Sequence, residues 1–397
     1  MGSLNRGVGP FSPANPDAPY FQIKIQETIY DIDINFIESL TVDRQTDQAG
    51  ELHFTIYDRS DPVRDDSSGL EYKFNQIIAY YGDQYLLSFQ YGWNHGPKSP
   101  WYSGNIMDYT PTYLPGGYIK MDVKVLLVTK EFDSVEQVKA YTGMSSSDIV
   151  AQICEDMGWV IEDLEPSKPY AVPKTFEVSN VDVISFIREE IEPKTVNIKN
   201  EPFRFYIEPI NGQNHVYFVS VNKSISVQKN YNFYVNMGNY GSVLSWSPSY
   251  TGKQVSNRVV EMPVFDTDTN DMTVYKAGDR KPVDGGPSLT AYGATDPDLM
   301  EAMIANKWFN ENVGTIKATM EIVGDPTIKP QQKINVMAMN PNGSSHISSG
   351  TYLVTHITDT ISGDFRSSLE LIQEGVEGGN GLETMPMSEI VELKGSV

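Results

Sequence analysis

The sequence predicts a mainly β protein with an α+β insertion: two small antiparallel β-barrels and, between them, a domain of helices and a hairpin. Three observations favour this fold class. Apolar and polar residues alternate in many short runs, turn-forming residues separate those runs, and one central stretch changes to helical spacing. We expect five parts, which span residues 1–20, 21–129, 130–235, 236–375 and 376–397.

The first two parts are an extended arm and a β-barrel. Residues 1–20 contain many glycines and prolines, which predicts an extended arm without a core of its own. Alternation then predicts the first barrel, with strands at 21–25, 52–57, 86–93, 102–109 and 118–128.

The middle part, residues 130–235, changes to helical spacing. Apolar residues recur at helical intervals over residues 145–157 and again over about 181–191. Ser179 or Asn180 is expected to cap the second helix, because short polar side chains accept bonds from the first helical N–H groups. An Asn-Gly pair between two alternating runs then predicts a hairpin over residues 203–221.

The second barrel is predicted at residues 236–375. A helix is expected near 297–310, where an aspartate precedes a proline at the first helical position. Four closely spaced strands should close the barrel, at about 315–322, 334–338, 352–361 and 365–371.

The strand at 352–361 is apolar on both faces by simple alternation. Tyr352 and Val354 would lie on one face, and Leu353, Ile357 and Ile361 on the other. Such a strand suggests a closed barrel that presses against a helix or a neighbouring subunit. Internal packing within one domain is an equal alternative.

The second barrel resembles a known family. Its pattern of strands and turns is similar to the second barrel of phage tail baseplate hub proteins, which include late-control hub proteins of contractile tails and the hub part of type VI secretion spikes. The matching residues are Val323, Gly324, Asp325, Pro326, Gly350, Tyr352, Val354, His356, Gly363, Phe365 and Leu369. One position departs from the family: Gln331 follows Pro330 where a glycine is usual, so we expect a different turn, because Gln rarely adopts positive φ.

The resemblance implies a function. It implies barrels of the tail-tube-like type and a homotrimer that adapts a six-fold tail tube to a three-fold central spike. Tail tube and spike proteins would be its partners, with the tape measure and baseplate wedge proteins as further candidates. The protein would assemble in the host cytoplasm, act in the baseplate of the virion, and form a channel for DNA ejection.

The charge balance fits a wall past which DNA moves. The chain has 30 Lys and Arg against 52 Asp and Glu, a formal net charge of −22. This argues against binding to a phosphate backbone, which needs clustered cations. It fits a surface that repels nucleic acid, or simply a soluble acidic protein, which is the more common case. A trimer that meets a six-fold tube needs six similar surfaces, so the resemblance implies two barrels of one topology, side by side around a channel. The acid excess would then give this channel an acidic lumen.

The sequence predicts no enzyme, cofactor, metal site or membrane span. A calcium-loop start at Asp266, Asp268 and Asn270 lacks the glycine and glutamate that such a loop needs. The single cysteine, Cys154, excludes an intrachain disulfide. A tail-associated cell-wall hydrolase and a carbohydrate-binding host-recognition module remain alternatives.

The last part, residues 376–397, is predicted to be a flexible tail. A glycine-rich linker precedes a short apolar patch, and exposed apolar segments often bind partners. The candidate partner-binding residues are Met385, Met387, Ile390, Val391 and Leu393.

Overall fold

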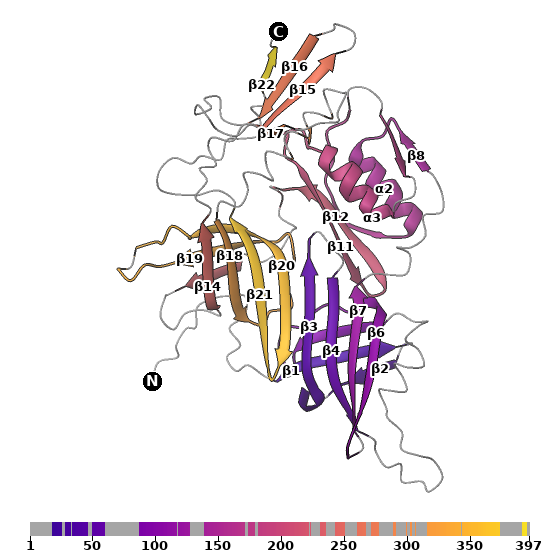
Figure 1. Cartoon of the computed structure of the whole chain (residues 1–397), viewed down its shortest axis with the longest axis vertical. Helices are drawn as coiled ribbons and strands as arrows, with labels where there is room; N and C mark the ends of the chain where they lie inside the picture. The colour runs from indigo at the N-terminus through magenta and orange to yellow at the C-terminus, as the bar shows by residue number, and fades with distance from the viewer. Residues whose placement is uncertain are drawn as a thin grey trace.

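The fold was analysed in a computed structural model. It describes residues 18–25, 28–32, 34–46, 50–59, 87–116, 118–127, 139–170, 174–178, 182–221, 223, 231–235, 243–250, 260–266, 271–277, 289–290, 299, 302–303, 306, 316–342, 344–373 and 391–394. The described residues are mostly in strands, so the predicted fold class is confirmed as mainly β (Figure 1). The predicted arm, apart from its last residues, lies outside the described residues.

The first β unit is a rolled antiparallel sheet. Its elements are β1 (Pro19–Ile25), β2 (Thr28–Asp31), the short helix η1 (Ile34–Phe36), β3 (Ile37–Gln45), β4 (Gly50–Arg59), β5 (Leu87–Trp93), β6 (Tyr102–Leu114) and β7 (Tyr118–Leu127). The strand order is β2-β1-β5-β6-β7-β4-β3. The five predicted strands are all present, and β2 and β3 are additional ones.

The second β unit consists of six strands. They are β13 (Tyr231–Val235), β14 (Val243–Tyr250), β18 (Ile316–Val323), β19 (Lys333–Ala338), β20 (Gly350–Ser362) and β21 (Asp364–Gln373). Their order is β13-β19-β20-β21-β18-β14. Because β13 pairs with β19, the ladder of this unit begins before the boundary predicted at residue 236.

The two β units repeat one topology. With β2 set aside, each unit places its strands, numbered in chain order, as 1-4-5-6-3-2. The fifth and sixth strands even match in length, 13 and 10 residues in both units. The fifth strands, β6 and β20, also carry a bulge at the same place, next to Ile106 and Val354. The expectation of a shared topology is thus confirmed for strand order, while β1 and β13 differ in direction.

The predicted closure of each barrel is wrong for the described strands. No ladder joins β13 to β14 or β2 to β3 among them. The physical reason in the first unit is that β20 of the second unit occupies the outer edge of β3, from His356 opposite Gln45 to Ile361 opposite Leu40. The two units therefore share one continuous sheet, and they lie side by side (Figure 1).

The bulge in β20 corrects the predicted faces of Ile357 and Ile361. Before the bulge Tyr352 and Val354 are buried on one face and Leu353 is buried on the other, so the prediction holds for this part of the strand. The bulge adds one residue, so Ile357 and Ile361 return to the same side as Tyr352. Simple alternation had placed them on opposite faces.

The middle unit combines the α-helices α2 and α3 with short strands and a hairpin. Its elements are β8 (Lys139–Thr142), α2 (Ser146–Met157), β9 (Val160–Leu164), β10 (Thr175–Val178), α3 (Val183–Phe186), η3 (Ile187–Ile191), η4 (Glu192–Lys194), β11 (Phe203–Ile210) and β12 (Gln213–Ser220). The second helix starts later than predicted and its N-cap is Asp182, which accepts from Ser185 N at 2.8 Å; the proposed caps Ser179 and Asn180 lie outside the described residues.

The segment between β14 and β18 joins other parts of the molecule. Leu299, Ala302, Met303 and Asn306 are helical, in line with the helix predicted there. Leu299 packs against the core of the middle unit, and Asn306 Nδ2 donates to Pro193 O at 3.1 Å, so this helix lies on the middle unit rather than inside the second β unit.

A small separate sheet contains the end of the chain. Its strands are β15 (Val260–Asp266), β16 (Asp271–Ala277), β17 (Leu289–Thr290) and β22 (Val391–Lys394). Within the part of the chain that the structure describes, no helix is long and apolar enough to cross a membrane.

Candidate functional site

Eight antiparallel strands form one continuous surface across both β units. Their order is β14-β18-β21-β20-β3-β4-β7-β6, and they lie in a row in Figure 1. One face of this row is buried in the cores of the two units. The other face is mostly polar, since most of the alternate residues that lie on it are exposed or half-buried. The molecule therefore presents a wide polar sheet face that is built from both repeats.

This polar face is acidic. Among the residues with described side chains it carries eight carboxylates and four lysines and arginines. The carboxylates are Glu38, Asp43, Glu51, Asp108, Asp122, Glu321, Asp364 and Glu370. The cations are Lys120, Lys124, Lys317 and Arg366. Ion pairs occupy three of the cations, so the unpaired charge on the face is mainly negative.

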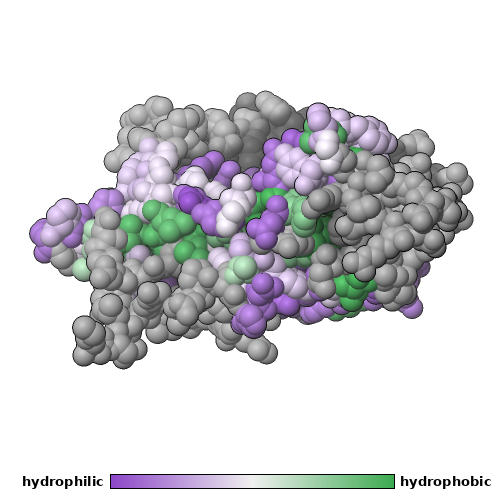
Figure 2. Space-filling model, turned by 90° about the horizontal axis from the view of Figure 1, so that it is seen from below, coloured by the Kyte–Doolittle hydropathy of each residue, from purple (hydrophilic) through white to green (hydrophobic). Residues whose placement is uncertain are grey.

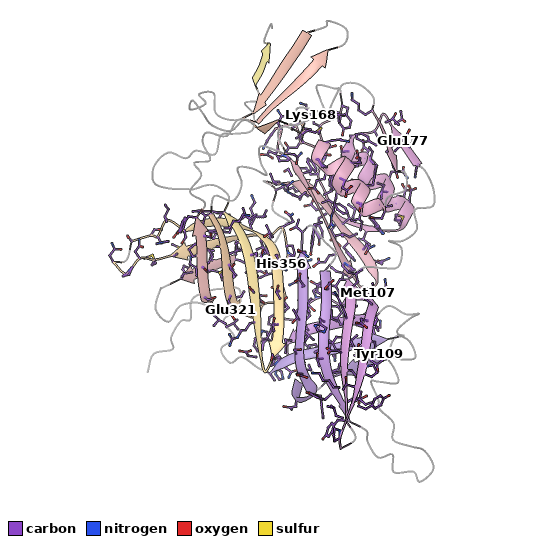
Figure 3. The ribbon with its side chains drawn as sticks, viewed as in Figure 1. Met107, Tyr109, Lys168, Glu177, Glu321 and His356 are labelled. Atoms are coloured by element: carbon purple, nitrogen blue, oxygen red, sulfur yellow. The ribbon has the colours of Figure 1, made fainter. Side chains whose placement is uncertain are left out.

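A histidine bridges the two units on this face. His356 of β20 contacts Asp43 Oδ1 of β3 through Nε2 at 2.7 Å and Glu370 of β21 through Nδ1 at 3.3 Å (Figure 3 labels His356). The hydrogen bond with Asp43 raises the pKa of His356 above its ordinary value. The protonated imidazole can donate to both carboxylates at once, so protonation strengthens the contact between the units.

We expect this contact to stabilise the protein at acidic pH. Since the folded pKa lies above the unfolded one, the added stability is complete below about pH 6.5 and is lost as the pH rises through the folded pKa. His356→Gln should remove up to about 1 kcal/mol at pH 5.5 and little at pH 9. Urea unfolding at both pH values measures this. His95→Gln, on an exposed loop, serves as the control, and equal losses at both pH values would contradict the assignment.

A buried ion pair lies behind this face at the junction. Arg44 of β3 donates from Nη2 to Asp359 Oδ2 of β20 at 2.7 Å, and both side chains are almost completely buried. Tyr91 donates its hydroxyl to the same oxygen at 2.5 Å, and Ser367 donates to Oδ1. Burial raises the pKa of Tyr91 well above its usual range, so the phenol stays protonated and remains a donor. Residues of both units thus satisfy one buried carboxylate.

The polar network continues into the middle unit. Arg44 Nη1 donates to the hydroxyl of Tyr102 at 2.9 Å, and Tyr102 in turn donates to Glu208 Oε1 of β11 at 2.9 Å. The other oxygen of Glu208 accepts from Lys329 Nζ, of the second unit, at 2.6 Å. Two buried or half-buried cations therefore face two buried carboxylates, and the hairpin of the middle unit is tied to both β units.

The first core includes side chains from the second unit. Phe365 follows the β20–β21 turn and packs against Trp93 and Tyr91, with ring centroids 5.4 and 5.9 Å away. Trp93 Nε1 donates to Gly324 O at 2.8 Å. A Cβ atom on Gly324 would lie 2.2 Å from Phe365, so only glycine fits between this ring and the backbone. The predicted motif residues Gly324 and Phe365 thus meet at the junction.

The other motif residues shape the strands that lead there. Asp325 is buried and accepts from Thr327, while Gly363 has φ 79° in the tight β20–β21 turn. Tyr352 donates its hydroxyl to Ser348 O at 2.8 Å in the second core. Pro326 lies in the turn after Asp325, and Gly350 begins β20. Val354 lies next to the bulge in β20.

The expectation for Gln331 is wrong. Gln331 has φ 66°, the left-handed conformation that a glycine would supply. Two backbone bonds hold it there: Gln331 N donates to Val354 O at 2.8 Å, and Val354 N donates to Gln332 O at 2.9 Å. The turn after Pro330 therefore contains a left-handed residue that is not glycine.

Sequence reasoning missed the four charged residues of the network: Arg44, Asp359, Glu208 and Lys329. A signal was present for two of them. Arg44 lies two residues after the buried Val42, and Asp359 lies two residues from both Ile357 and Ile361. Because side chains alternate along a strand, each charged residue occupies a core-facing position. Such a charge needs a buried partner, which comes from another unit and cannot be located without the register.

Of the predicted tail residues, Val391 and Leu393 lie on β22, opposite Lys276 and Val274 of β16, so the prediction of a flexible tail is wrong for residues 391–394. Met385, Met387 and Ile390 lie outside the described residues. The described side chains include no group of three or more His, Cys, Asp or Glu placed to hold a metal ion. Cys154 is buried, and burial raises its pKa to about 12.

We compared the chain with known proteins, and the matches are to solved structures. Neither a protein-family model nor a curated protein matches the chain. Solved structures do. A tail protein from Neisseria meningitidis matches with a TM-score of 0.59 and 10% identity, over 90% of this chain and 98% of that one. The 43 kDa tail protein of a Shewanella oneidensis prophage matches with a TM-score of 0.57 and 10% identity, over 90% and 97%.

A third structure links the fold to secretion systems. An Escherichia coli component of the type VI secretion system, described as similar to bacteriophage T4 tail proteins, matches with a TM-score of 0.51 and 10% identity, over 89% of this chain and 76% of that one. At these identities the similarity shows the fold: this chain has the fold of phage tail proteins and of that secretion protein.

Proposed function

From the premise that this chain has a phage tail protein fold, we propose that it is a structural baseplate hub of a phage tail or a related contractile injection system. Three copies form a ring that adapts the six-fold tail tube to the three-fold central spike. One observation carries the proposal: each chain contains two β units of the same strand order, joined edge to edge in one sheet. Three such chains offer six similar units without breaking three-fold symmetry.

The polar sheet face supports a role as a channel wall. It crosses both repeats without interruption, and its carboxylates outnumber its cations. A negative wall repels DNA phosphates, so DNA can pass without binding. In this arrangement the polar face lines the lumen, and the middle unit lies outside the ring of β units.

The oligomeric state tests this proposal. We expect light scattering of the purified protein to give three times the mass of the 44.4 kDa chain, and negative-stain images to show a ring with a central hole. A single-chain mass at every concentration, with compact particles that have no hole, would contradict it.

The tail is proposed to bind the spike or the tube protein. A glycine-rich linker gives it reach, and its apolar residues provide a contact surface. We expect truncation after Glu374, which also removes β22 from the small sheet, to weaken binding to these proteins at least about tenfold in a pull-down titration, while circular dichroism shows that the strands of the two β units are kept. Unchanged binding would show that the tail has no such role.

A further inference from the structure

The row of eight strands ends at β14 on one side and at β6 on the other (Figure 1), and among the described residues both ends have a strand edge without a partner. At one end the outer edge of β14 has no partner strand among the described residues. At the other end, the pairing of β5 with β6 stops at Gly104. Among the described residues, the C-terminal half of β6 therefore pairs only with β7. Unpaired edges of this kind bind other strands unless they are blocked.

We infer that the free edge of β6 binds the free edge of β14 in a second copy of this chain. The argument comes from the internal repeat. Inside the chain, the fifth strand of unit two (β20) pairs with the second strand of unit one (β3). The equivalent strands of the opposite units are β6 and β14, and these two end the row with edges that have no partner among the described residues. The same contact, made between copies, would extend the sheet from chain to chain.

The ladders give this contact a register. The bulges align β6 with β20, so that Thr112 corresponds to Thr360. The pairing of β3 with β4 and of β14 with β18 aligns Thr41 with Ser247. Thr360 lies opposite Thr41 within the chain, so Thr112 should lie opposite Ser247 of the neighbouring copy.

Side chains on both edges suit such a contact. In this register Tyr113 meets Trp246 and Tyr109 meets Tyr250. Tyr113 is 69% exposed and Tyr250 is 47% exposed, which is unusual for large aromatic residues. The hydroxyl of Tyr109 is buried without a hydrogen-bond partner among the described residues, and burial raises its pKa to about 12. Figure 2 shows apolar patches on the surface seen from below, and Figure 3 labels Met107 and Tyr109 on β6.

Two prolines make this contact weaker than the internal one. Proline is tolerated within an edge strand where its backbone nitrogen, which has no hydrogen, faces away from the neighbouring strand. We therefore expect the backbone nitrogens of Pro111 in β6 and Pro248 in β14 to face the free edges. The register places them opposite each other, where they supply no hydrogen bond. Their counterparts inside the chain are Asp359 and Val42, which lie at the buried ion pair. The internal junction is therefore stabilised by a buried ion pair. The junction between copies would instead depend on aromatic packing around a pair of residues that donate no backbone hydrogen bond.

This inference rests on the proposed function for the number of copies, and a disulfide test separates the two. Oxidised Thr112→Cys/Ser247→Cys protein should give covalent dimers and trimers on a non-reducing gel. Both positions are on the polar face, and directly opposite strand residues are close enough for a disulfide. Thr41→Cys/Thr360→Cys is the matched control, which should cross-link within one chain only. Each single-cysteine variant should give no trimer.

The outcomes are distinct. A mass of three chains without any disulfide between chains would overturn the β6–β14 contact and leave the hub proposal standing. A single-chain mass would overturn both. Cross-linked products longer than three chains would support the contact and contradict a three-copy ring.

A second variant tests the contact without cysteines. Tyr113→Arg should raise the protein concentration needed for assembly about tenfold or more, because an aromatic anchor is replaced by a charge. Ile198→Arg, at a position 80% exposed on the middle unit, should leave it unchanged. Equal effects of the two variants would overturn the inference.

Discussion

Replacing Asp359 with alanine is expected to lower the free energy of unfolding by about 3–5 kcal/mol. The substitution leaves the guanidinium of Arg44 buried without its counter-ion, and it removes the acceptor for the hydroxyls of Tyr91 and Ser367. Both β units lose stability together, because Asp359 comes from one and Arg44 from the other. Urea unfolding followed by tryptophan fluorescence measures the loss.

Two control variants separate burial from charge. Asp364→Ala, on the neighbouring strand, removes an exposed partner of Arg366 and should cost less than about 1 kcal/mol. The double variant Arg44→Met/Asp359→Leu removes both buried charges and should recover much of the loss. If Asp359→Ala were no more harmful than Asp364→Ala, the buried pair would not hold the junction.

Replacing Phe365 with alanine is expected to cost about 3–5 kcal/mol. The ring is almost fully buried and fills the first core between Tyr91 and Trp93, although it belongs to the second unit in sequence. Amide hydrogen exchange in β1 and β5 should therefore accelerate, even though the substitution lies more than 250 residues away along the chain.

Phe36→Ala gives the matched comparison, since Phe36 is 38% exposed in the first unit. It should cost about 1 kcal/mol or less. Faster exchange confined to β20 and β21 in Phe365→Ala would contradict the view that this ring is part of the first core.

Local patterns predicted much of this fold. Alternation located the strands of both units because each has one buried face, and the Asn-Gly pair located the hairpin, whose Asn211 and Gly212 have φ 52° and 78°. The bulge in β20 was not predictable in the same way. It shifts the phase of the strand, and only the pairing with β21 reveals that shift.

The candidate site was harder to predict than the strands. The motif residues Gly324 and Phe365 were recognised as family-like, yet their contact with Trp93 depends on how two distant segments pack. The partner of Asp359 lies 315 residues away in the chain, and nothing local to either residue identifies it. The acidic face required the strand order, because it collects alternate residues from eight strands.

A cryo-electron microscopy map of the assembled protein tests the central claim most directly. The account predicts three chains and six β units around a hole, with the face that carries Glu38, Glu321 and His356 lining that hole, and β6 of each chain beside β14 of the next. A map in which this face points outward, or in which the β units of different chains do not alternate around one ring, would contradict it.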